Sequence, residues 1–533
     1  MERKILKNKI YLYLTEFFAG MSVMAAELGA SRLLAPYFSS SQIVWTIIIG
    51  TIMIAMALGN IYGGRTADKN PDPDRLYLRI TAAAVWLAAI PVLGKYVIVG
   101  ISGVMIFAVN SNLLIWAAFA ACMVIFVFPL FLLGTVTPSL VKYSVDSLDK
   151  SGGTVGLLNA SNTIGSIIGT FVPTFVTIPT VGTSATFLIF AGILLALSAI
   201  YFFSEKRKLL QISLAIAAAL LCCVFGAVSG FAFWQDDIEY EGESVYNYLQ
   251  VTEDEDEVIL STNVLFGVQS MLEKSGGLTG MYYDYAMAAP YMAGLYEKDG
   301  LDVLILGMGT GTYATQCSNY FDNLNFEGVE IDEKIIALSR EYFRLPETVG
   351  VTLYDGRAFL NAADKKYDVI MVDAYQDITI PFQMSTVEFF TLVKDHLNEG
   401  GVMVMNMNMN SGGENGINAY LSDTVSAVFD SVYTVDVSRT SNVELFAANG
   451  FDMIKRMSEN VEKEDDPELR ALMERISSGL QKYSAGERVM TDDRAPVELL
   501  GIRAIDALIF DQAEYYKAVF RAYGFKGLIS SLS

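Results

Sequence analysis

Hydrophobic residues are distributed unevenly along this chain of 533 residues. Before residue 234, long apolar stretches are separated by short polar turns, whereas after it apolar runs are short and alternate with polar segments. About 20 consecutive apolar residues are enough to cross the roughly 30 Å hydrocarbon core of a bilayer. The seven stretches of about this length are Ile10–Leu34, Ile43–Tyr62, Leu76–Leu93, Leu113–Leu133, Val155–Ile178, Thr183–Phe203 and Leu209–Phe233. The first part is therefore predicted to be a multi-pass α-helical membrane domain.

The second part has a different periodicity. Short alternating runs from about Ser244 to Met271 predict a small β-rich region, and from Asp302 onward strands and helices alternate with short turns. That alternation is typical of an α/β fold with a doubly wound parallel sheet. The predicted domains are a transmembrane domain (1–234), a β-rich part (235–300), an α/β domain (301–500) and a helical tail (501–533).

Composition and charge support this division. Hydrophobic residues make up 53% of the chain and its mean hydropathy is +0.38, which is too apolar for an ordinary soluble protein. Residues 1–233 carry 15 basic and 9 acidic side chains, whereas residues 234–533 carry 22 and 50. An acidic surface repels nucleic acid, so we expect a lipid bilayer and a small molecule as partners, but no nucleic acid.

A glycine-rich loop follows the first strand of the α/β region. The strand 303–306 leads into Gly307, Gly309 and Gly311, and the next strand ends in a carboxylate, Glu330, about 20 residues on. Glycines let backbone N–H groups approach a ligand closely, and a carboxylate at this place accepts both ribose hydroxyls. Alternating glycines followed by an acid-ended strand are typical of S-adenosylmethionine sites. This region is therefore predicted to be Rossmann-like, of the S-adenosylmethionine-dependent transferase type.

Five stretches make the chain resemble one family. They are Glu243–Tyr248, Val329–Asp332, Asp355–Arg357, Asp373–Tyr375 and Thr491–Glu498. With them, residues from about Glu243 to Glu498 resemble the spermidine synthase (polyamine aminopropyltransferase) family, in the form fused behind a membrane domain. Members of that family move an aminopropyl group from decarboxylated S-adenosylmethionine to a diamine and leave methylthioadenosine. The resemblance implies a transferase with S-adenosylmethionine, or its decarboxylated form, as co-substrate.

The side chain expected to carry the chemistry is Asp373. It follows the strand 368–372, and in an open parallel sheet ligands bind beyond the carboxyl ends of the strands. The chain has one histidine, His396, at a predicted helix end, and its four cysteines lack metal-ligand spacing, so no metal is expected. A carboxylate within reach of an amine can orient it and accept its proton. Asp373 is therefore the predicted general base.

The resemblance also implies binding roles. It implies that Glu330 binds the ribose of the donor and that Asp355 binds the adenine amino group, with Gly356 allowing close approach. It places the three loop glycines around the sulfur side of the donor. The residues implied in substrate binding are Gln269, Tyr282, Tyr283, Asp284, Tyr375, Asp377 and Asp493.

Two positions depart from the family pattern. Thr310 in the glycine loop and Gln376 after the predicted base stand where the soluble enzymes carry aspartates that hold cationic groups. Thr310 suits a donor that retains its carboxylate, so a decarboxylated and an intact donor both stay open. Two other functions stay open as well: a methyltransferase or another enzyme that cleaves S-adenosylmethionine, and a nucleoside-binding transporter or sensor without turnover.

The distribution of basic residues predicts the membrane topology. Thirteen of the 15 basic residues before residue 234 lie in Arg3–Lys9, Arg65–Arg79, Lys142–Lys150 and Lys206–Lys208. Basic loops stay in the cytoplasm, which places the N-terminus there. Seven crossings would put the acidic domain outside the cell although the nucleoside donor is cytosolic, so its side stays open. The acceptor and the oligomeric state stay open too, and a homodimer is compatible with the sequence.

Overall fold

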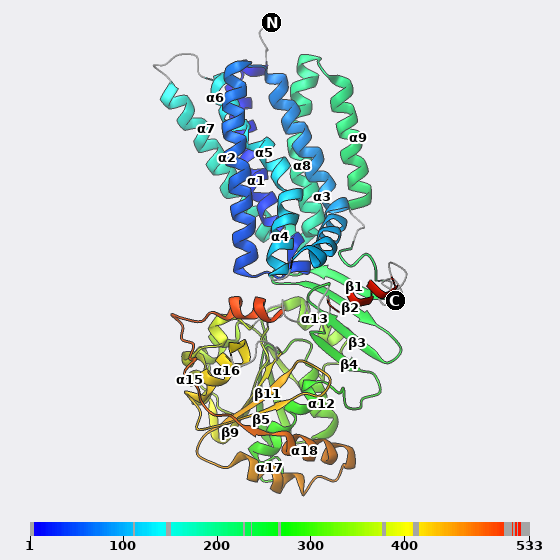
Figure 1. Ribbon diagram of the computed structural model, residues 1–533, viewed down its shortest axis with the longest axis vertical. Coiled ribbons are helices and arrows are strands. Elements are labelled where there is room, and N and C mark those ends of the chain that lie inside the picture. The colour runs from blue at the N-terminus through cyan, green and yellow to red at the C-terminus, as the bar shows by residue number, and fades with distance from the viewer. Residues whose placement is uncertain are drawn as a thin grey trace. The chain divides into compact units, whose positions relative to one another are not determined.

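A computed structural model describes most of the chain. The described residues are 5–109, 112–144, 151–226, 230–235, 237–264, 268–375, 380–408, 415–505, 514, 517–519 and 521–523. The chain forms two compact units, Met1–Asp236 and Asp237–Ser533 (Figure 1). The described strands all belong to the second unit.

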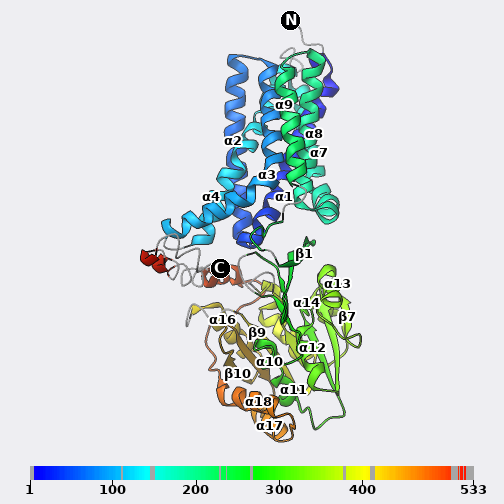
Figure 2. The same ribbon diagram turned by 90° about the vertical axis from the view of Figure 1, so that its right-hand side faces the viewer.

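All of the secondary structure that is described in the first unit is helical. Its helices are η1 (Ile5–Lys7), α1 (Lys9–Phe38), α2 (Gln42–Lys69), α3 (Pro73–Ala108), α4 (Leu113–Ile125), α5 (Val127–Gly134), α6 (Val136–Ser144), α7 (Ser151–Val172), η3 (Pro173–Thr177), α8 (Ile178–Glu205) and α9 (Leu209–Gly226). Ser41 caps α2 by accepting the N–H of Val44, which would otherwise lack a partner. Figure 2 shows α3, α8 and α9 running side by side.

Six helical stretches among the described residues are long and apolar enough to cross a membrane, judged by length and composition. They are Lys9–Phe38, Gln42–Lys69, Pro73–Ile106, Val127–Ser144, Ser151–Glu205 and Leu209–Gly226. The sequence predicted seven. The numbers differ because the predicted spans 155–178 and 183–203 are counted together in Ser151–Glu205, although the backbone at Gly182 is not helical, with φ 81° and ψ 171°, and separates two helices.

The predicted span 113–133 is interrupted instead of continuous. Helix α4 ends at Ile125 and α5 begins at Val127. Pro129 has no N–H with which to bond the carbonyl of Ile125 four residues earlier, so the helical hydrogen-bond ladder breaks there. The indole N–H of Trp86 donates to that carbonyl at 2.8 Å, which stabilises the break.

The second unit begins with a small antiparallel sheet. Its strands are β1 (Ile238–Glu243), β2 (Tyr248–Glu253), β3 (Glu257–Ser261) and β4 (Ser270–Glu273), in the order β1-β2-β3-β4. Alternate residues such as Leu249, Val251 and Leu260 are buried against α13 (Glu333–Glu341). The small β region was predicted from the sequence, although its first strand begins six residues earlier than expected.

A larger sheet follows in the second unit. Its described strands are β5 (Leu301–Leu306), β6 (Leu324–Glu330), β7 (Gly350–Leu353), β8 (Tyr367–Val372), β9 (Leu397–Met407), β10 (Ser431–Asp436), β11 (Val443–Ala448) and β12 (Gln481–Lys482). Their order is β12-β10-β11-β9-β8-β5-β6-β7. The strands from β5 to β9 are parallel, as the sequence predicted.

The predicted doubly wound parallel sheet has antiparallel strands at one edge. β11 runs antiparallel to β9, and β10 pairs antiparallel with both β11 and β12. The loop of residues 437–442 between β10 and β11 is too short for the crossover that parallel neighbours require, whereas it suits a hairpin. The sheet is therefore mixed, with the parallel strands in the majority.

Helices cover the large sheet. They are α10 (Tyr282–Ala286), α11 (Ala288–Ala293), α12 (Thr312–Tyr320), α13, α14 (Gly356–Ala362), α15 (Val387–Asp395), α16 (Ile417–Ser426), α17 (Met453–Val461) and α18 (Pro467–Gly479). Side chains of α10, α11, α12, α17 and α18 share one hydrophobic core with β5, β8, β9 and β11. Of the predicted tail 501–533, residues 501–505, 514, 517–519 and 521–523 are described, and these are helical.

The strand order reverses between β5 and β8. From β5 the chain proceeds to β6 and β7 on one side, and it then returns to β8 and β9 on the other. The loops after two such strands diverge and leave a crevice at their carboxyl ends, which is where ligands bind in open α/β sheets. The residues that follow β5, β6 and β8 are thereby brought to one place.

Candidate active site

The glycine loop after β5 brings two strand ends together. Gly307 has a φ of 78°, and a Cβ atom on it would lie 2.4 Å from the Cα of Ala374, directly after β8. A side chain at Gly307 would therefore push the ends of β5 and β8 apart. Gly311 has a φ of 80° and starts α12, and a Cβ atom there would meet Leu345 at 2.3 Å.

Glu330, the last residue of β6, is held by two backbone groups. Its Oε2 accepts the N–H of Gly309 at 2.8 Å and its Oε1 accepts the N–H of Asp332 at 3.0 Å. The side chain is 7% exposed, and its burial raises the pKa of Glu330 to about 7, although the backbone hydrogen bonds oppose that rise. The carboxyl group is thus fixed beside the glycine loop before any ligand arrives.

Asp373 follows β8 and is held by two side chains. Its Oδ2 accepts the hydroxyl of Tyr282 at 2.5 Å, and its Oδ1 accepts the amide N–H of Asn406 at 3.0 Å. The Oδ1 of Asn406 in turn accepts from the amide of Asn442 at 2.8 Å, which fixes the orientation of the Asn406 amide. Burial raises the pKa of Asp373 to about 7, and the two hydrogen bonds oppose the rise. A carboxylate with a pKa near neutrality is well suited to accept a proton.

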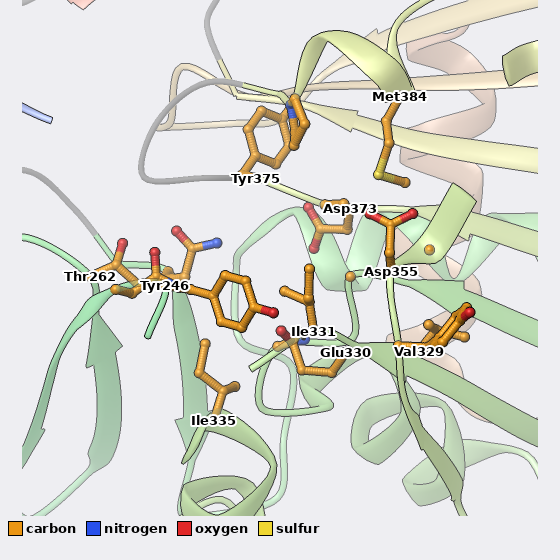
Figure 3. Close-up of a pocket in the computed structure, with 18 of the residues that line it drawn as sticks. Tyr246, Thr262, Val329, Glu330, Ile331, Ile335, Asp355, Asp373, Tyr375 and Met384 are labelled. Carbon is orange, nitrogen blue, oxygen red and sulfur yellow. Dashed lines mark hydrogen bonds between the residues drawn. The ribbon is translucent and has the colours of Figure 1, made fainter. Parts of the chain in front are cut away.

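These groups line one cavity of about 360 Å³, a volume within the usual range of ligand pockets. Figure 3 shows the carboxylate of Asp373 facing the cavity, with Tyr375 and Met384 above it and the ring of Tyr246 across from it. The predicted site residues that line the cavity are Gln269, Gly307, Gly309, Glu330, Asp355, Gly356, Asp373 and Tyr375. They come from distant parts of the sequence, and the reversal of the strand order brings them together.

Two predicted tyrosines lie directly behind this lining. Tyr282 donates to Asp373, and Tyr283 donates from its hydroxyl to the carbonyl of Gln269 at 3.1 Å. Their ring centroids are 4.0 Å apart and both rings are buried. Burial raises the pKa of Tyr282 well above its usual value, with the neighbouring Asp373 adding to the effect, so its hydroxyl stays protonated and keeps donating.

Three other predicted residues do not line the cavity. Gly311 supports the loop through the backbone conformation described above. Asp284 is buried and accepts the N–H groups of Thr279 and Gly280, so it organises a turn. Asp493 is exposed to solvent. A further predicted residue, Asp377, lies outside the described residues.

Asp355 lines the cavity and also makes a structural contact. Its side chain caps α14 by accepting the N–H of Ala358 at 2.8 Å. Gly356 follows, and a Cβ atom there would lie 3.3 Å from the Cε of Met384. The start of α14 is thus fitted closely against the wall of the cavity. Among the described residues, no group of three or more histidine, cysteine or acidic side chains is placed to hold a metal ion.

Comparison with known proteins identifies the family. A model of the spermine/spermidine synthase domain matches residues 285–457. A protein of Bifidobacterium longum named "Probable polyamine aminopropyl transferase" is 48% identical over 353 residues, which cover 62% of this chain and 78% of that protein. The chain belongs to the polyamine aminopropyltransferase family of enzymes. The resemblance found in the sequence is thereby confirmed.

More distant relatives are similar over smaller parts of the chain. A polyamine aminopropyltransferase of Vibrio vulnificus is 28% identical over 196 residues, or 35% of this chain and 64% of that protein. A crystal structure of a spermidine synthase in complex with the transition-state analogue AdoDATO is 21% identical, covers 44% of this chain and 84% of the other, and has a TM-score of 0.37.

Sequence analysis missed several residues in and around this aminopropyltransferase pocket. Asn406 lies in β9, and nothing in the sequence around it showed that its amide reaches Asp373. In the segment Thr491–Glu498, which was matched to the family, Asp492 accepts two hydrogen bonds of 2.7 Å from Arg357. The lining residues that were missed are Tyr246, Asn247, Thr262, Val329, Ile331, Ile335, Tyr354, Ala374, Pro381, Gln383 and Met384.

The close approach at Gly307 leads to a prediction. Gly307→Ala should lower the free energy of unfolding of the catalytic unit by about 1–3 kcal/mol more than a matched glycine variant, since the new Cβ collides with Ala374. The matched control is Gly450→Ala, because Gly450 has a similar φ of 76° and no atom within 4 Å of an added Cβ. Chemical denaturation monitored by circular dichroism would compare the two variants. Equal losses in the free energy of unfolding would contradict the steric role of Gly307.

Proposed function

We propose that this protein transfers an aminopropyl group from decarboxylated S-adenosylmethionine to an amine, with Asp373 as the general base. One observation carries the proposal: the buried carboxyl group of Glu330 at the end of β6 and the half-buried carboxyl group of Asp373 after β8 line one cavity, at the point where the strand order reverses. One of them suits the binding of a ribose and the other suits proton transfer. The family assignment supports the aminopropyl group as the group that is transferred.

The donor would lie along the carboxyl ends of β5, β6 and β7. Glu330 would accept hydrogen bonds from the ribose hydroxyls, and it is already oriented by the N–H groups of Gly309 and Asp332. Asp355 would bind the adenine amino group at the start of α14. The sulfonium end would lie by the backbone of Gly307 and Gly309 and next to Asp373, which line the same cavity.

The reaction would be a direct displacement at carbon. The acceptor enters as an ammonium and gives one proton to the carboxylate of Asp373. Its nitrogen lone pair then attacks the aminopropyl methylene carbon that is attached to the sulfonium of the donor. A C–N bond forms, and the bond between that carbon and sulfur breaks. The electron pair of the broken bond stays on sulfur, so methylthioadenosine leaves as a neutral thioether. Tyr282 and Asn406 hold the carboxylate in place during this step.

We propose that residues 1–234 anchor the enzyme in a membrane, with the N-terminus in the cytoplasm. Six helical stretches with the necessary length and composition support the proposal. The remaining proposed domains are the β-rich part 235–300, the nucleoside-binding part 301–500 and the helical tail 501–533. Accessibility of cysteines introduced near residue 205 and near residue 300, tested from each side in intact cells, would establish on which side the catalytic unit lies.

Product analysis tests the proposed reaction. The full-length protein, purified in detergent, is incubated with an amine and with either decarboxylated or intact S-adenosylmethionine, and the nucleosides are identified by mass spectrometry. Methylthioadenosine and an amine heavier by one aminopropyl group are expected with the decarboxylated donor. Formation of S-adenosylhomocysteine from the intact donor would show methyl transfer instead, and binding of a donor without any product would show a sensor or transporter.

The raised pKa of Asp373 predicts a pH dependence. The base acts only when ionised, so kcat/KM should fall about tenfold for each pH unit below about 7 and level off above it. Glu330 titrates in the same range, and its protonation should weaken donor binding and steepen the fall. Rates measured from about pH 5 to 9 at saturating donor would isolate the contribution of Asp373. A rate that is constant down to pH 5 would exclude it as the base.

A further inference from the structure

The amide that donates to Asp373 is itself held by a second amide. The Nδ2 of Asn406 donates to the Oδ1 of Asp373 at 3.0 Å, and the Oδ1 of Asn406 accepts from the Nδ2 of Asn442 at 2.8 Å. Asn406 is 2% exposed, so solvent competes little for these two contacts. Asn442 is not part of the cavity lining. Two hydrogen bonds in series therefore connect a residue outside the cavity to the proposed base.

The direction of this chain of hydrogen bonds matters for the base. An amide side chain has a donor end and an acceptor end, and a half-turn of the group exchanges them. The NH₂ group of Asn406 stabilises an ionised Asp373, whereas its oxygen would repel the carboxylate and would accept only from the protonated acid. The contact from Asn442 engages the oxygen of Asn406 and leaves the NH₂ group for Asp373. The second amide thus favours the orientation that suits a base.

The hairpin between β10 and β11 holds Asn442 in place. The backbone N–H and carbonyl groups of Asn442 are both hydrogen-bonded within the loop 437–442. The hydroxyl of the neighbouring Ser441 donates to the carbonyl of Asn408 at 3.2 Å, which ties the hairpin to the residue after β9. Asn442 stands two residues before Glu444, the partner of Asn406 in the sheet register, so its side chain lies on the same face of the sheet as Asn406. The backbone therefore directs this amide to Asn406.

We propose that Asn442 is a positioning residue for the transfer reaction: it orients the amide of Asn406 so that Asp373 meets a hydrogen-bond donor and acts as a base in its ionised form. The inference rests on the proposed function, because the base is the one named there. Asn442 acts through Asn406 and is not itself a catalytic residue. A donor that stabilises the carboxylate lowers the pKa of the acid and so extends catalysis to lower pH. A loop residue outside the cavity would thereby set the pH range of the enzyme.

Other titratable groups also surround the base. They are Tyr282 and Tyr283 on α10, Tyr375 after β8, Glu444 on β11, and Tyr246, Glu330, Tyr354 and Asp355, which line the same cavity. Burial raises the pKa of Tyr282, Tyr283 and Tyr375 above the usual value, so their hydroxyl groups stay neutral up to pH 10. All of these groups are the same in every variant compared below. A difference in pH profile between those variants therefore arises in the hairpin.

The test is the pH dependence of kcat/KM for the amine, measured from pH 5 to 10 with the full-length protein in detergent at saturating donor. Asn442→Leu removes the amide and nearly keeps its shape, so the midpoint of the profile should rise by about 0.5–1 pH unit. Asn442→Asp offers only acceptor atoms, so the NH₂ group of Asn406 should turn to it and leave an oxygen facing Asp373. That midpoint should rise by about 1–2 pH units, and most of the lost rate should return at pH 10.

Ser441→Asp is the matched control for the added charge, since Ser441 is the neighbouring residue and its hydroxyl contacts Asn408 and not Asn406. Its midpoint should move by less than half as much as that of Asn442→Asp. Equal movement in both variants would reduce the effect to charge repulsion and overturn the inference.

A rate that falls equally at every pH, with an unmoved midpoint, would also overturn the inference and make Asn442 a support of the fold. The two substitutions at Asn442 change the hairpin in different ways, so one folded variant is enough for this decision. If the unaltered protein yields no methylthioadenosine, or shows no fall in rate below about pH 7, the proposed function itself fails. That result is distinguishable because it is seen without any substitution.

Discussion

Asp373→Asn should lower turnover by about 10²–10⁴-fold while leaving donor binding nearly unchanged. Asparagine has almost the same shape as aspartate, and its amide oxygen can still accept one of the two hydrogen bonds from Tyr282 and Asn406, but it cannot accept the proton of the attacking amine. Glu330, which is proposed to hold the ribose, is not altered. Initial rates at saturating substrates would give the loss in kcat, and calorimetric titration would give the affinity for the donor.

The control for this variant is Asp395→Asn, the same chemical change at an exposed residue at the end of α15. Stability gives a second check. Because burial raises the pKa of Asp373 from 3.8 to about 7, the protein loses stability as the pH rises between these two values, where the group ionises in the unfolded chain but not in the folded protein, and the loss is complete above about 7. Asparagine never ionises, so the variant should unfold at pH 8 at a temperature no lower than the unaltered protein. Normal turnover by a folded Asp373→Asn protein would remove the proposed mechanism.

The sequence predicted those features of the site that depend on short segments. Gly307, Glu330 and Asp373 each stand at the end of a predicted strand, and a strand end is recognisable without knowledge of the partner strand. The rule that ligands bind at the carboxyl ends of parallel strands then places such residues together. The structure brings all three to one cavity.

Features that depend on strand pairing were not accessible in this way. Asn406 reaches Asp373, and Glu444 lies beside Asn406, only because β9 pairs with β8 in parallel and with β11 in antiparallel register. The sequence shows alternation within each strand but not which residue lies opposite. The same limit explains the antiparallel edge formed by β10, β11 and β12, which the regular alternation of strands and helices did not predict.

The structural role of Asp284 could not be predicted from the sequence. It follows two tyrosines that reach Asp373 and Gln269, so a role in substrate binding was a natural prediction. In the short helix α10 the side chain is not part of the cavity lining and accepts hydrogen bonds from Thr279 and Gly280. Neighbours in a helix point in directions about 100° apart, so consecutive residues of this stretch cannot all face one ligand.

Glu330→Gln should have the opposite effect to Asp373→Asn: weaker donor binding with little loss of kcat at saturating donor. The two oxygens of Glu330 accept the N–H groups of Gly309 and Asp332, and the proposed ribose hydroxyls need the same carboxylate. Glutamine has one oxygen, so its NH₂ group would face an N–H donor and the negative charge would be lost. We expect donor binding to weaken by about 1–3 kcal/mol, which is roughly 5–150-fold in Kd.

Calorimetric titration of Asp373→Asn and Glu330→Gln with the same donor separates an effect on binding from an effect on the reaction. Neither variant alone makes this distinction. The matched control is Glu347→Gln, an exposed residue before β7 that should bind the donor normally. If Glu330→Gln binds the donor as tightly as the unaltered protein, the ribose is held by other groups, and Asp355 becomes the next residue to alter. If it instead loses turnover at full occupancy of the donor, Glu330 acts in the displacement step, and the assignment of one carboxyl group to binding and the other to proton transfer is wrong.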